Sequence, residues 1–358
     1  MRVLMTADAV GGVWTYALEL VDALAASDVE VHLAVMGPSP SDAQRAEAEA
    51  SSIAGLHENP GPLEWMPDPW DELADSGEWL LRLEELLRPD LIHLNSYVHG
   101  ALPWRAPVVV VGHSCVLSWW EAVRGEPAPP AWNRYRDEVA RGLASADAVV
   151  APSSWMLDEL GRLYAVRGGR VVLNGLRPRP DAASRKEPVV LTAGRLWDEA
   201  KNVAAVLSVA PELSGHVEIA GTESGAARDN VRCLGRLPRA RLLERLRRAA
   251  VFALPVRYEP FGLGPLEAAA ARCALVLGDT PSMRELWGDA AHLVHPDDHA
   301  GLRDTCNGLL LSDDRRALWA ERARRRAAEL TAERMAARYL SLYQVLTVRE
   351  HAGSREAS

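Results

Sequence analysis

The sequence predicts an α/β fold built from two doubly wound, Rossmann-like parallel sheets. The first observation is size, because 358 residues are about twice the length of a usual domain and predict two separate cores. The second is a pattern in which short β-branched runs alternate with helical stretches, as in βα units. The third is a polar stretch with glycine and paired prolines at residues 174–187, which is interpreted as a linker.

The first series of βα units predicts a domain over residues 1–175. Its helices include residues 14–26 and 131–144, and a further helix begins after Ser153, because serine is a favoured helix N-cap. Its predicted strands are residues 2–5, 29–36, 91–94, 108–111, 148–151 and 170–173.

The second series predicts a domain over residues 188–330. Its predicted strands are residues 189–193, 217–220, 231–234, 251–254, 274–277 and 292–294, and helices follow at 298–311, 313–330 and 331–346. The tail from Glu350 is polar and is predicted to be loose. Ligands of doubly wound sheets bind at the carboxyl ends of the strands, so the loops that follow strands are the places to look for function.

Composition is that of a globular protein, with 48% hydrophobic and 25% charged residues, which argues against a disordered, fibrous or membrane-embedded chain. The N-terminus lacks the long apolar core of a secretion signal. The four cysteines have no spacing typical of a zinc site or a disulfide framework, so reduced thiols and a cytoplasmic location are expected. These cysteines are Cys115, Cys233, Cys273 and Cys306.

Charge is unevenly distributed along the chain. Residues 1–150 carry 9 Lys and Arg against 23 Asp and Glu, a net charge of −14, and the remainder carries 31 against 26, a net charge of +5. Nucleic acids and anionic membranes bind through clustered Lys and Arg, so an acidic first half predicts neither a nucleic-acid partner nor stable membrane insertion. Nothing in the sequence indicates an oligomeric state.

Two acidic residues flank a glycine-bearing turn in the second half. Glu259 and Glu267 enclose the segment Pro-Phe-Gly-Leu-Gly-Pro-Leu, which follows the strand at 251–254 and enters a helix predicted to open at Pro265. The N–H groups of Leu263 and Gly264, next to Gly262, can approach a phosphate at this helix N-terminus. The alternative is that the two acids only favour the helix dipole.

Two cations follow the strand at 189–193. Arg195 and Lys201 lie six residues apart in the loop, where they can bracket a diphosphate, the arginine through a planar fork and the lysine as a point charge. Lysine is rare in this chain, since only Lys186 and Lys201 occur, which favours a specific role for a lysine in this loop. The alternative is a pair of ordinary exposed charges.

Strand ends in the first half supply further candidates. The Gly11-Gly12 turn lets backbone come close to a ligand, although a plain structural turn is an equal alternative. His113 follows the strand at 108–111, where it could hydrogen-bond a sugar hydroxyl or serve only structure. Candidate acceptor contacts by the same reasoning, with packing as the alternative, are Asn95, Tyr97, Trp119 and Trp120.

Together these loops resemble the retaining glycosyltransferases of the GT-B fold, specifically family 4, over nearly the whole chain. Gly194-Arg195 with Lys201-Asn202 resembles the family's donor-phosphate motif, and Glu259 to Glu267 resembles its E-x7-E signature. The resemblance implies two Rossmann-like domains facing a cleft, with a nucleotide diphosphate sugar as the donor. It also implies that the last helix, residues 331–350, packs back on the first domain.

The resemblance assigns roles to the matching residues. Arg195 and Lys201 would neutralise the diphosphate with help from Gly11, Gly12 and the turn at 262–264. Glu267 would hold the ribose and Glu259 the hydroxyls of the donor sugar. Arg236 and Leu237 would meet the nucleobase, and His113 would contact the transferred sugar. The chain departs from the family pattern at Arg272-Cys273 and at Thr280-Pro281-Ser282, where small residues and glycines are usual.

The expected reaction is therefore a metal-independent, anomer-retaining transfer of a hexosyl-type sugar to a small-molecule or saccharide acceptor. No cofactor is expected beyond the donor, because fixed positive groups can stabilise the leaving diphosphate and no compelling DxD-type pair is present. Two alternatives remain: a GT-B-like nucleotide-sugar epimerase and a non-catalytic nucleotide-sugar binding protein. A dinucleotide-dependent oxidoreductase is disfavoured, since neither half has a GxGxxG followed by an acid about twenty residues later.

Overall fold

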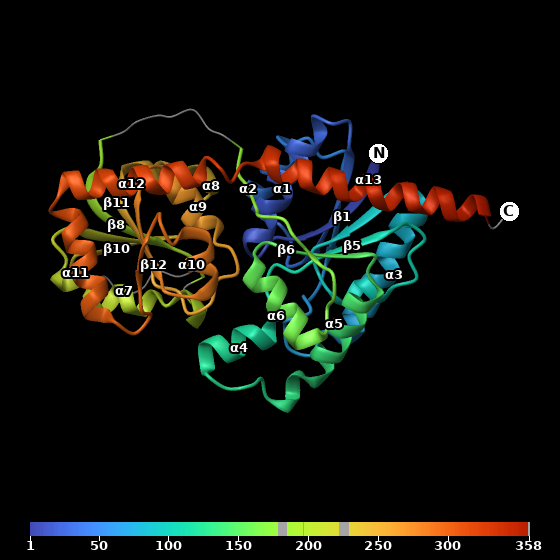
Figure 1. The fold of residues 1–358 in the computed structure, drawn as a ribbon, viewed down its shortest axis with the longest axis horizontal. Coiled ribbons are helices and arrows are strands. Elements are labelled where there is room, and N and C mark those ends of the chain that lie inside the picture. The colour runs from blue at the N-terminus through green and yellow to red at the C-terminus, as the bar shows by residue number, and fades with distance from the viewer. Residues whose placement is uncertain (178–184, 196, 222–228, 357–358) are drawn as a thin grey trace. The chain divides into compact units, whose positions relative to one another are not determined.

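The computed structural model describes the chain except for residues 178–184, 196, 222–228 and 357–358 (Figure 1). It divides into two compact units. The first comprises Met1–Trp120, Pro127–Arg177 and Thr331–Ser358, and the second comprises Glu121–Glu126 and Pro178–Leu330. Each unit is built on one parallel sheet with helices on both faces, so the predicted fold class is confirmed. The middle of the predicted linker, 178–184, lies outside the described residues.

The first unit contains a seven-stranded sheet in the order β3-β2-β1-β4-β5-β6-β7, with all pairs parallel. Its strands are β1 (Arg2–Asp8), β2 (Glu30–Gly37), β3 (Gly55–Pro60), β4 (Leu91–Leu94), β5 (Val108–Val111), β6 (Ala148–Ala151) and β7 (Arg170–Val171). The sequence missed β3, because this half-exposed edge strand, Gly-Leu-His-Glu-Asn-Pro, lacks the β-branched residues that mark strands. The strand predicted at 170–173 is shorter than expected.

Helices of the first unit connect and cover these strands. They are α1 (Gly12–Ala25), α2 (Asp42–Glu49), α3 (Trp70–Leu87), α4 (Val116–Arg124), α5 (Asn133–Ser145), α6 (Ser154–Tyr164) and α13 (Ala332–Glu356), with short 3-10 turns η1 (Val98–Ala101) and η2 (Pro130–Trp132). Ser153 caps α6 as predicted, since its side chain accepts a hydrogen bond from the N–H of Met156. The prediction that the last helix ends near 346 was wrong, because α13 continues to Glu356 through a stretch without proline.

The second unit contains a six-stranded parallel sheet in the order β10-β9-β8-β11-β12-β13. Its strands are β8 (Glu187–Ala193), β9 (His216–Ala220), β10 (Val231–Gly235), β11 (Ala249–Leu254), β12 (Ala274–Gly278) and β13 (His292–Val294). All six predicted strands occur, with ends that differ by two residues or fewer. The central strands β8, β11 and β12 are apolar and mostly buried, as expected for a sheet covered on both faces, whereas edge strand β10 is only partly buried.

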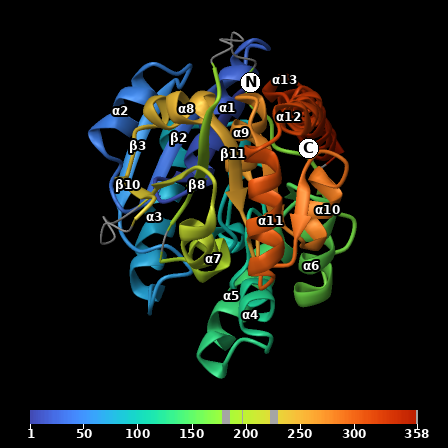
Figure 2. The ribbon, with the colours of Figure 1, turned by 90° about the vertical axis from the view of Figure 1, so that its left-hand side faces the viewer.

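Helices lie on both faces of this second sheet (Figures 1 and 2). Helices α7 and α11 pack together on one face, and α8, α9 and α12 pack on the other. Their bounds are α7 (Val203–Val209), α8 (Arg239–Arg248), α9 (Leu263–Ala270), α10 (Pro281–Trp287), α11 (His299–Leu310) and α12 (Asp313–Ala327), with 3-10 turns η3 (Glu199–Lys201) and η4 (Ala210–Glu212).

Helix α13 is held in the first unit by a buried aromatic cluster. The Nδ1 atom of His93 on β4 lies 2.5 Å from the hydroxyl of Tyr343, and its Nε2 atom lies 3.2 Å from the hydroxyl of Tyr16 on α1. Tyr339 packs against both the His93 and the Tyr16 rings. The His93 ring thus joins the buried hydroxyls of Tyr16 and Tyr343 by hydrogen bonds, which fix α13 on this sheet.

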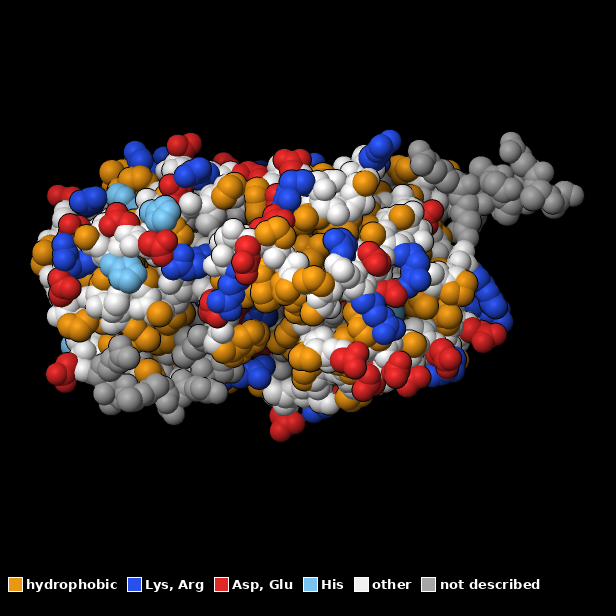
Figure 3. Space-filling model, turned by 90° about the horizontal axis from the view of Figure 1, so that it is seen from below, with side chains coloured by type: hydrophobic (Ala, Val, Ile, Leu, Met, Phe, Trp, Pro, Cys, Tyr) orange, Lys and Arg blue, Asp and Glu red, His pale blue; other side chains and the backbone are white. Residues whose placement is uncertain are grey.

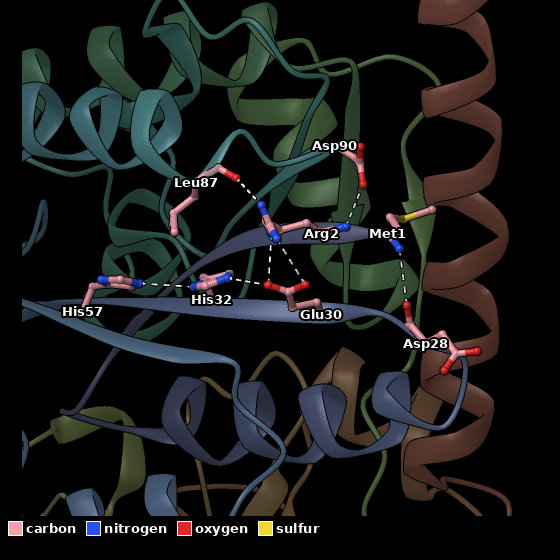
Figure 4. A network of polar contacts seen from close by, with 8 residues as sticks. All are labelled: Met1, Arg2, Asp28, Glu30, His32, His57, Leu87 and Asp90. Atoms are coloured by element: carbon pink, nitrogen blue, oxygen red, sulfur yellow. Dashed lines mark hydrogen bonds and ion pairs between the residues drawn. The ribbon is translucent and has the colours of Figure 1, made fainter.

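A second polar network ties together the amino ends of β1 and β2 (Figure 4). Arg2 donates to the Glu30 carboxylate at 3.0 Å and to the Leu87 carbonyl at the end of α3 at 2.7 Å. The same carboxylate lies 2.9 Å from Nε2 of His32, whose other nitrogen faces His57 on β3. This network lies at the sheet edge opposite to the carboxyl ends of the strands, so it stabilises the sheet away from the candidate site.

Buried histidines make the stability of the first unit depend on pH. Burial lowers the pKa of His93 and His113 to about 3 and that of His99 to about 4, against 6.5 for an ordinary histidine. Burial raises the pKa of Glu64 to about 7. Between pH 6.5 and 4.5 these three histidines therefore become protonated in the unfolded chain but stay neutral in the folded chain. Over the same range Glu64 is protonated in the folded chain but ionised in the unfolded chain.

We expect the free energy of unfolding to fall as the pH falls through this window. Each histidine contributes about 1.4 kcal/mol per pH unit and Glu64 offsets about one of them, leaving a slope equivalent to two histidines. Denaturant unfolding at pH 7, 6 and 5 measures this slope, and His99→Gln should make it shallower. A free energy of unfolding that stays constant over this range would contradict the prediction.

Candidate functional site

The candidate residues of the second unit gather where its strand order reverses. The sheet changes direction between β8 and β11, and in doubly wound sheets a ligand binds outside the carboxyl ends of the strands at this point. The loop from Gly194 to Asn202 leaves β8, and the loop from Pro255 to Gly262 leaves β11. Both predicted motifs therefore lie at one edge of one sheet.

Lys201 and Glu259 form an ion pair across these two loops. The Lys201 ammonium donates to Oε2 of Glu259 at 2.6 Å, and the two side chains are only 17% and 15% exposed. Gly262 adjoins this pair, since a Cβ atom there would lie 3.4 Å from Cγ of Glu259. The structure thus brings together the lysine, the first acid of the signature and the glycine turn.

Two residues to which the sequence assigned no role of their own fix this arrangement. Asn202, in the left-handed conformation with φ of 50°, donates to the carbonyls of Pro255 at 2.9 Å and Pro296 at 2.8 Å. These bonds fasten the residue after Lys201 to the end of β11. Ser282 donates to the Glu259 carbonyl at 2.6 Å and so supports the acid from the other side.

Arg195 lies on the same loop but holds a different carboxylate. Its guanidinium donates to Asp198 at 2.7 Å and lies 5.1 Å from the ring centre of the exposed Trp197. About a third of the Arg195 side chain is exposed. Asp198 in turn accepts the N–H of Ala200 in η3, so this carboxylate links the arginine to the turn that contains Lys201.

Helix α9 begins at Leu263, and the prediction that it opens at Pro265 was wrong. Gly262, with φ of 88°, is the residue before the helix and turns the chain into it. The N–H groups of Leu263 and Gly264 therefore belong to the first turn, where they have no carbonyl partner within the helix. Both residues are partly exposed, so their N–H groups can serve an anion.

Glu267 follows one turn later and is paired with an arginine that the sequence did not single out. The Nε atom of Arg239, in the first turn of α8, donates to Oε1 of Glu267 at 2.7 Å, and Glu267 is 7% exposed. Arg236 and Leu237 come just before α8, after Gly235 turns the chain with φ of 65°. The one signal for Arg239 was its place at the start of the helix that follows β10.

Two candidates of the first unit lie together at the carboxyl edge of its sheet. Asn95, after β4, donates from its side chain to the Thr6 carbonyl of β1 at 2.6 Å, and its Oδ1 lies 2.8 Å from Nε2 of His113, after β5. Gly11 and Gly12 leave β1 at the same edge and are exposed. A Cβ atom at Gly11 would have no heavy atom within 4 Å, so backbone is open there.

His113 is a neutral imidazole in this position. Burial among other rings lowers its pKa to about 3, and its ring packs edge-on against Tyr16 with centroids 4.5 Å apart. With Nε2 donating to the Asn95 carbonyl oxygen, Nδ1 is left as a hydrogen-bond acceptor. Such a group can bind a hydroxyl but does not act as a proton donor at neutral pH.

The remaining candidates of the first unit differ in exposure. Tyr97 is 3% exposed and its hydroxyl donates to the Ser114 carbonyl at 2.7 Å, so the structure places it in the core. Trp119 and Trp120 on α4 are partly exposed, with ring centroids 5.9 Å apart. Sequence reasoning missed Glu64, a buried carboxyl that accepts the N–H groups of Tyr97 and Val98.

Within the described residues, no three His, Cys, Asp or Glu side chains are grouped as metal ligands would be. No described helix combines the length and the apolar character that a membrane span requires.

Comparisons with known proteins agree on one family. Residues 10–178 match the model of Glycosyltransferase Family 4, and residues 178–326 match that of Glycosyl transferases group 1. The chain is 29% identical over 272 residues to an alpha-maltose-1-phosphate synthase of Mycolicibacterium smegmatis, covering 63% of the chain. This match spans just under two thirds, 65%, of that relative.

Two further matches extend over almost the whole chain. It is 28% identical to a D-inositol 3-phosphate glycosyltransferase of Xylanimonas cellulosilytica, over 97% of the chain and 94% of the relative. Among solved structures it is similar to a sucrose-phosphate synthase of Thermosynechococcus elongatus, with a TM-score of 0.80 and 19% identity, over 98% and 100% of the two chains. The structural match supports a GT-B fold.

The glycine turn allows a test of its geometry. In Gly262→Ala the new Cβ would lie 3.0 Å from Cγ of Pro265 in a left-handed conformation, so we expect a loss of about 1–3 kcal/mol in the free energy of unfolding. Gly264→Ala is the matched control, since its Cβ meets only Phe252 at 3.5 Å within a helix. Equal free energies of unfolding of the two variants, measured with denaturant, would contradict a left-handed turn at Gly262.

Proposed function

Since the chain belongs to glycosyltransferase family 4, we propose that it moves a hexosyl-type sugar from a nucleotide diphosphate sugar to a small-molecule or saccharide acceptor, with retention at the anomeric carbon and without a metal. The single observation that carries this proposal is the contact of Lys201 with Glu259 beside the Gly262 turn. These groups supply one cation, one sugar-binding acid and two free N–H groups at one sheet edge.

Positive groups at this edge have a direct chemical use. As the glycosidic bond to the donor phosphate breaks, positive charge develops on the sugar and negative charge gathers on the leaving diphosphate. The Lys201 ammonium and the N–H groups of Leu263 and Gly264 would stabilise that negative charge. They are held in place by secondary structure and by Asn202, so little reorganisation is needed during the reaction.

The ion pair itself gives donor binding a defined first step. A diphosphate that approaches Lys201 competes with the Glu259 carboxylate for the ammonium. The released carboxylate has acceptor oxygens for the hydroxyls of the donor sugar. On donor binding, the Lys201 ammonium would thus exchange the Glu259 carboxylate for the diphosphate, and the Glu259 carboxylate would exchange Lys201 for the sugar hydroxyls. Both side chains would have a polar partner before and after the donor binds.

Other roles follow from the surroundings of each residue. Glu267 gives one carboxylate oxygen to Arg239, which leaves the other oxygen for ribose hydroxyls. Arg195 would meet the outer face of the diphosphate. Backbone of Arg236 and Leu237 would meet the base.

In the first unit, neutral His113, oriented by Asn95, would accept a hydrogen bond from the transferred sugar. The leaving phosphate would accept the acceptor's proton, which supports retention without a protein base. Trp119 and Trp120 are the accessible candidates for acceptor contact.

We expect Lys201→Ala to lower kcat/KM by about a hundredfold to a thousandfold, as when one preorganised charge-stabilising group is lost. The substitution also leaves the mostly buried Glu259 unpaired, so some loss of stability is expected. The double variant Lys201→Ala with Glu259→Gln separates the two effects, because it should recover stability but not activity. Near-normal turnover of the single variant would remove the phosphate-binding role.

Thermal shift with UDP-, GDP-, ADP- and dTDP-sugars should identify the donor. We expect one base to raise the Tm, since a ligand bound only by the folded state stabilises it by mass action. Release of nucleoside diphosphate is then measured with and without acceptor sugars. Interconversion of the donor without acceptor would indicate an epimerase, and binding without any release would indicate a non-catalytic protein.

A further inference from the structure

A basic pocket lies entirely within the first unit, between β7 and the first turns of α13. Its volume is about 830 Å³, and its lining includes three arginines, one serine hydroxyl and two valines. These residues, here called the arginine pocket, are Arg170, Arg334, Arg338, Ser341, Val171 and Val172. None of them belongs to the residues assigned above to donor, sugar or acceptor.

The fold itself brings these arginines together. Arg334, Arg338 and Ser341 occupy positions i, i+4 and i+7 of α13, so their side chains form one stripe along the helix. The opposite side of the helix is fixed in the core by Tyr339 and Tyr343. Arg170 stands on the edge strand β7, and the backbone bridge from Leu176 to Thr331 holds the start of α13 beside the segment that follows β7. The fold therefore fixes the backbone positions of the residues that line the pocket.

Neither Arg170 nor Arg338 has an ion pair or side-chain hydrogen bond among the described residues. Most other arginines of the first unit have a carboxylate partner, as Arg2, Arg45 and Arg162 do. Like charges gathered around one cavity repel one another, and this repulsion is offset when an anion binds between them.

The arginine pocket lies on a unit whose net charge is negative. The residues of the first unit include 16 Lys and Arg against 26 Asp and Glu, a net charge of −10. Asp and Glu side chains gather along one side of this unit in the view from below (Figure 3). The presence of Arg170 and Arg338, without carboxylate partners among the described residues, on an otherwise acidic unit is better explained by a specific anionic ligand than by general attraction to polyanions.

We propose that the arginine pocket binds a phosphate ester. Guanidinium groups are planar forks that pair with phosphate oxygens through two parallel hydrogen bonds, and a serine hydroxyl adds a further donor. A volume of about 830 Å³ exceeds the needs of a bare phosphate and lies in the range of small-molecule sites. The two valines offer apolar contact to the organic part. The same phosphate ester chemistry is presented by a soluble metabolite and by a lipid headgroup.

The test uses the full chain and two probes at constant ionic strength. Glycerol 3-phosphate, followed by titration calorimetry, represents a soluble ester, and phosphatidylcholine vesicles with or without phosphatidic acid represent a headgroup. The variant Arg170→Gln with Arg338→Gln removes two guanidiniums. Arg82→Gln with Arg88→Gln, on α3 and just after it, is the matched control with the same change in charge on the same unit.

We expect at least one probe to bind, and the pocket variant to weaken that binding tenfold or more while the control variant leaves it unchanged. Binding of nucleoside diphosphate, measured in parallel, should be the same in all three proteins. Binding of glycerol 3-phosphate alone identifies a soluble ligand, and binding of acidic vesicles alone identifies a headgroup.

Three results would overturn the proposal: no binding of either probe, equal weakening by both double variants, or loss of nucleoside diphosphate binding in the pocket variant. Because both double variants change only exposed side chains, unchanged Tm values are expected and report correct folding. Failure of the proposed transferase activity would leave this binding test intact, since it measures no turnover.

Discussion

The ion pair between Lys201 and Glu259 is the interaction on which the candidate site depends. Two charges that are more than four-fifths removed from solvent are costly unless they meet, so each side chain determines where the other can lie. The loops that carry them leave β8 and β11, which are neighbours in the sheet although 58 residues separate the two side chains. Asn202 and Ser282 then hold both loops by bonds to main-chain carbonyls. The Lys201–Glu259 contact thus lies beside the Gly262 turn, at the sheet edge where the first N–H groups of α9 lie.

Much of the fold could be predicted from the sequence because parallel strands covered on both faces are short apolar runs. Strands such as β5 and β6 were found to the residue for that reason. Edge strand β3 was missed, since exposure on an edge permits His, Glu and Asn where a buried strand would not. In the candidate site, Lys201, Glu259 and Gly262 could be predicted to lie together from their places after two strands, and the structure brings them together. Arg239 and the partners of Asn202 could not, because these contacts join residues that only the folded chain brings near.

The departures from the family pattern have physical explanations in the second unit. Arg272, just after α9, has a left-handed backbone conformation with φ of 61°. Glycine is usual at such a helix end because it adopts this conformation without strain. Cys273 beside it is fully buried, and the Lys186 ammonium approaches its sulfur and donates to two helix-terminal carbonyls. Thr280 caps α10 and Ser282 supports Glu259. Of the two lysines in this chain, Lys186 therefore has a structural position and Lys201 a candidate functional one.

The aromatic anchoring of α13 has a consequence for how the protein is made. The first unit is assembled from segments on both sides of Pro178–Leu330, which make up nearly all of the second unit. During synthesis the surface of α1 that packs against α13 therefore stays uncovered until the residues of α13 have been made. The second unit, by contrast, is nearly continuous in sequence and can close earlier. The unit whose synthesis begins first is thus the one whose folding is completed last.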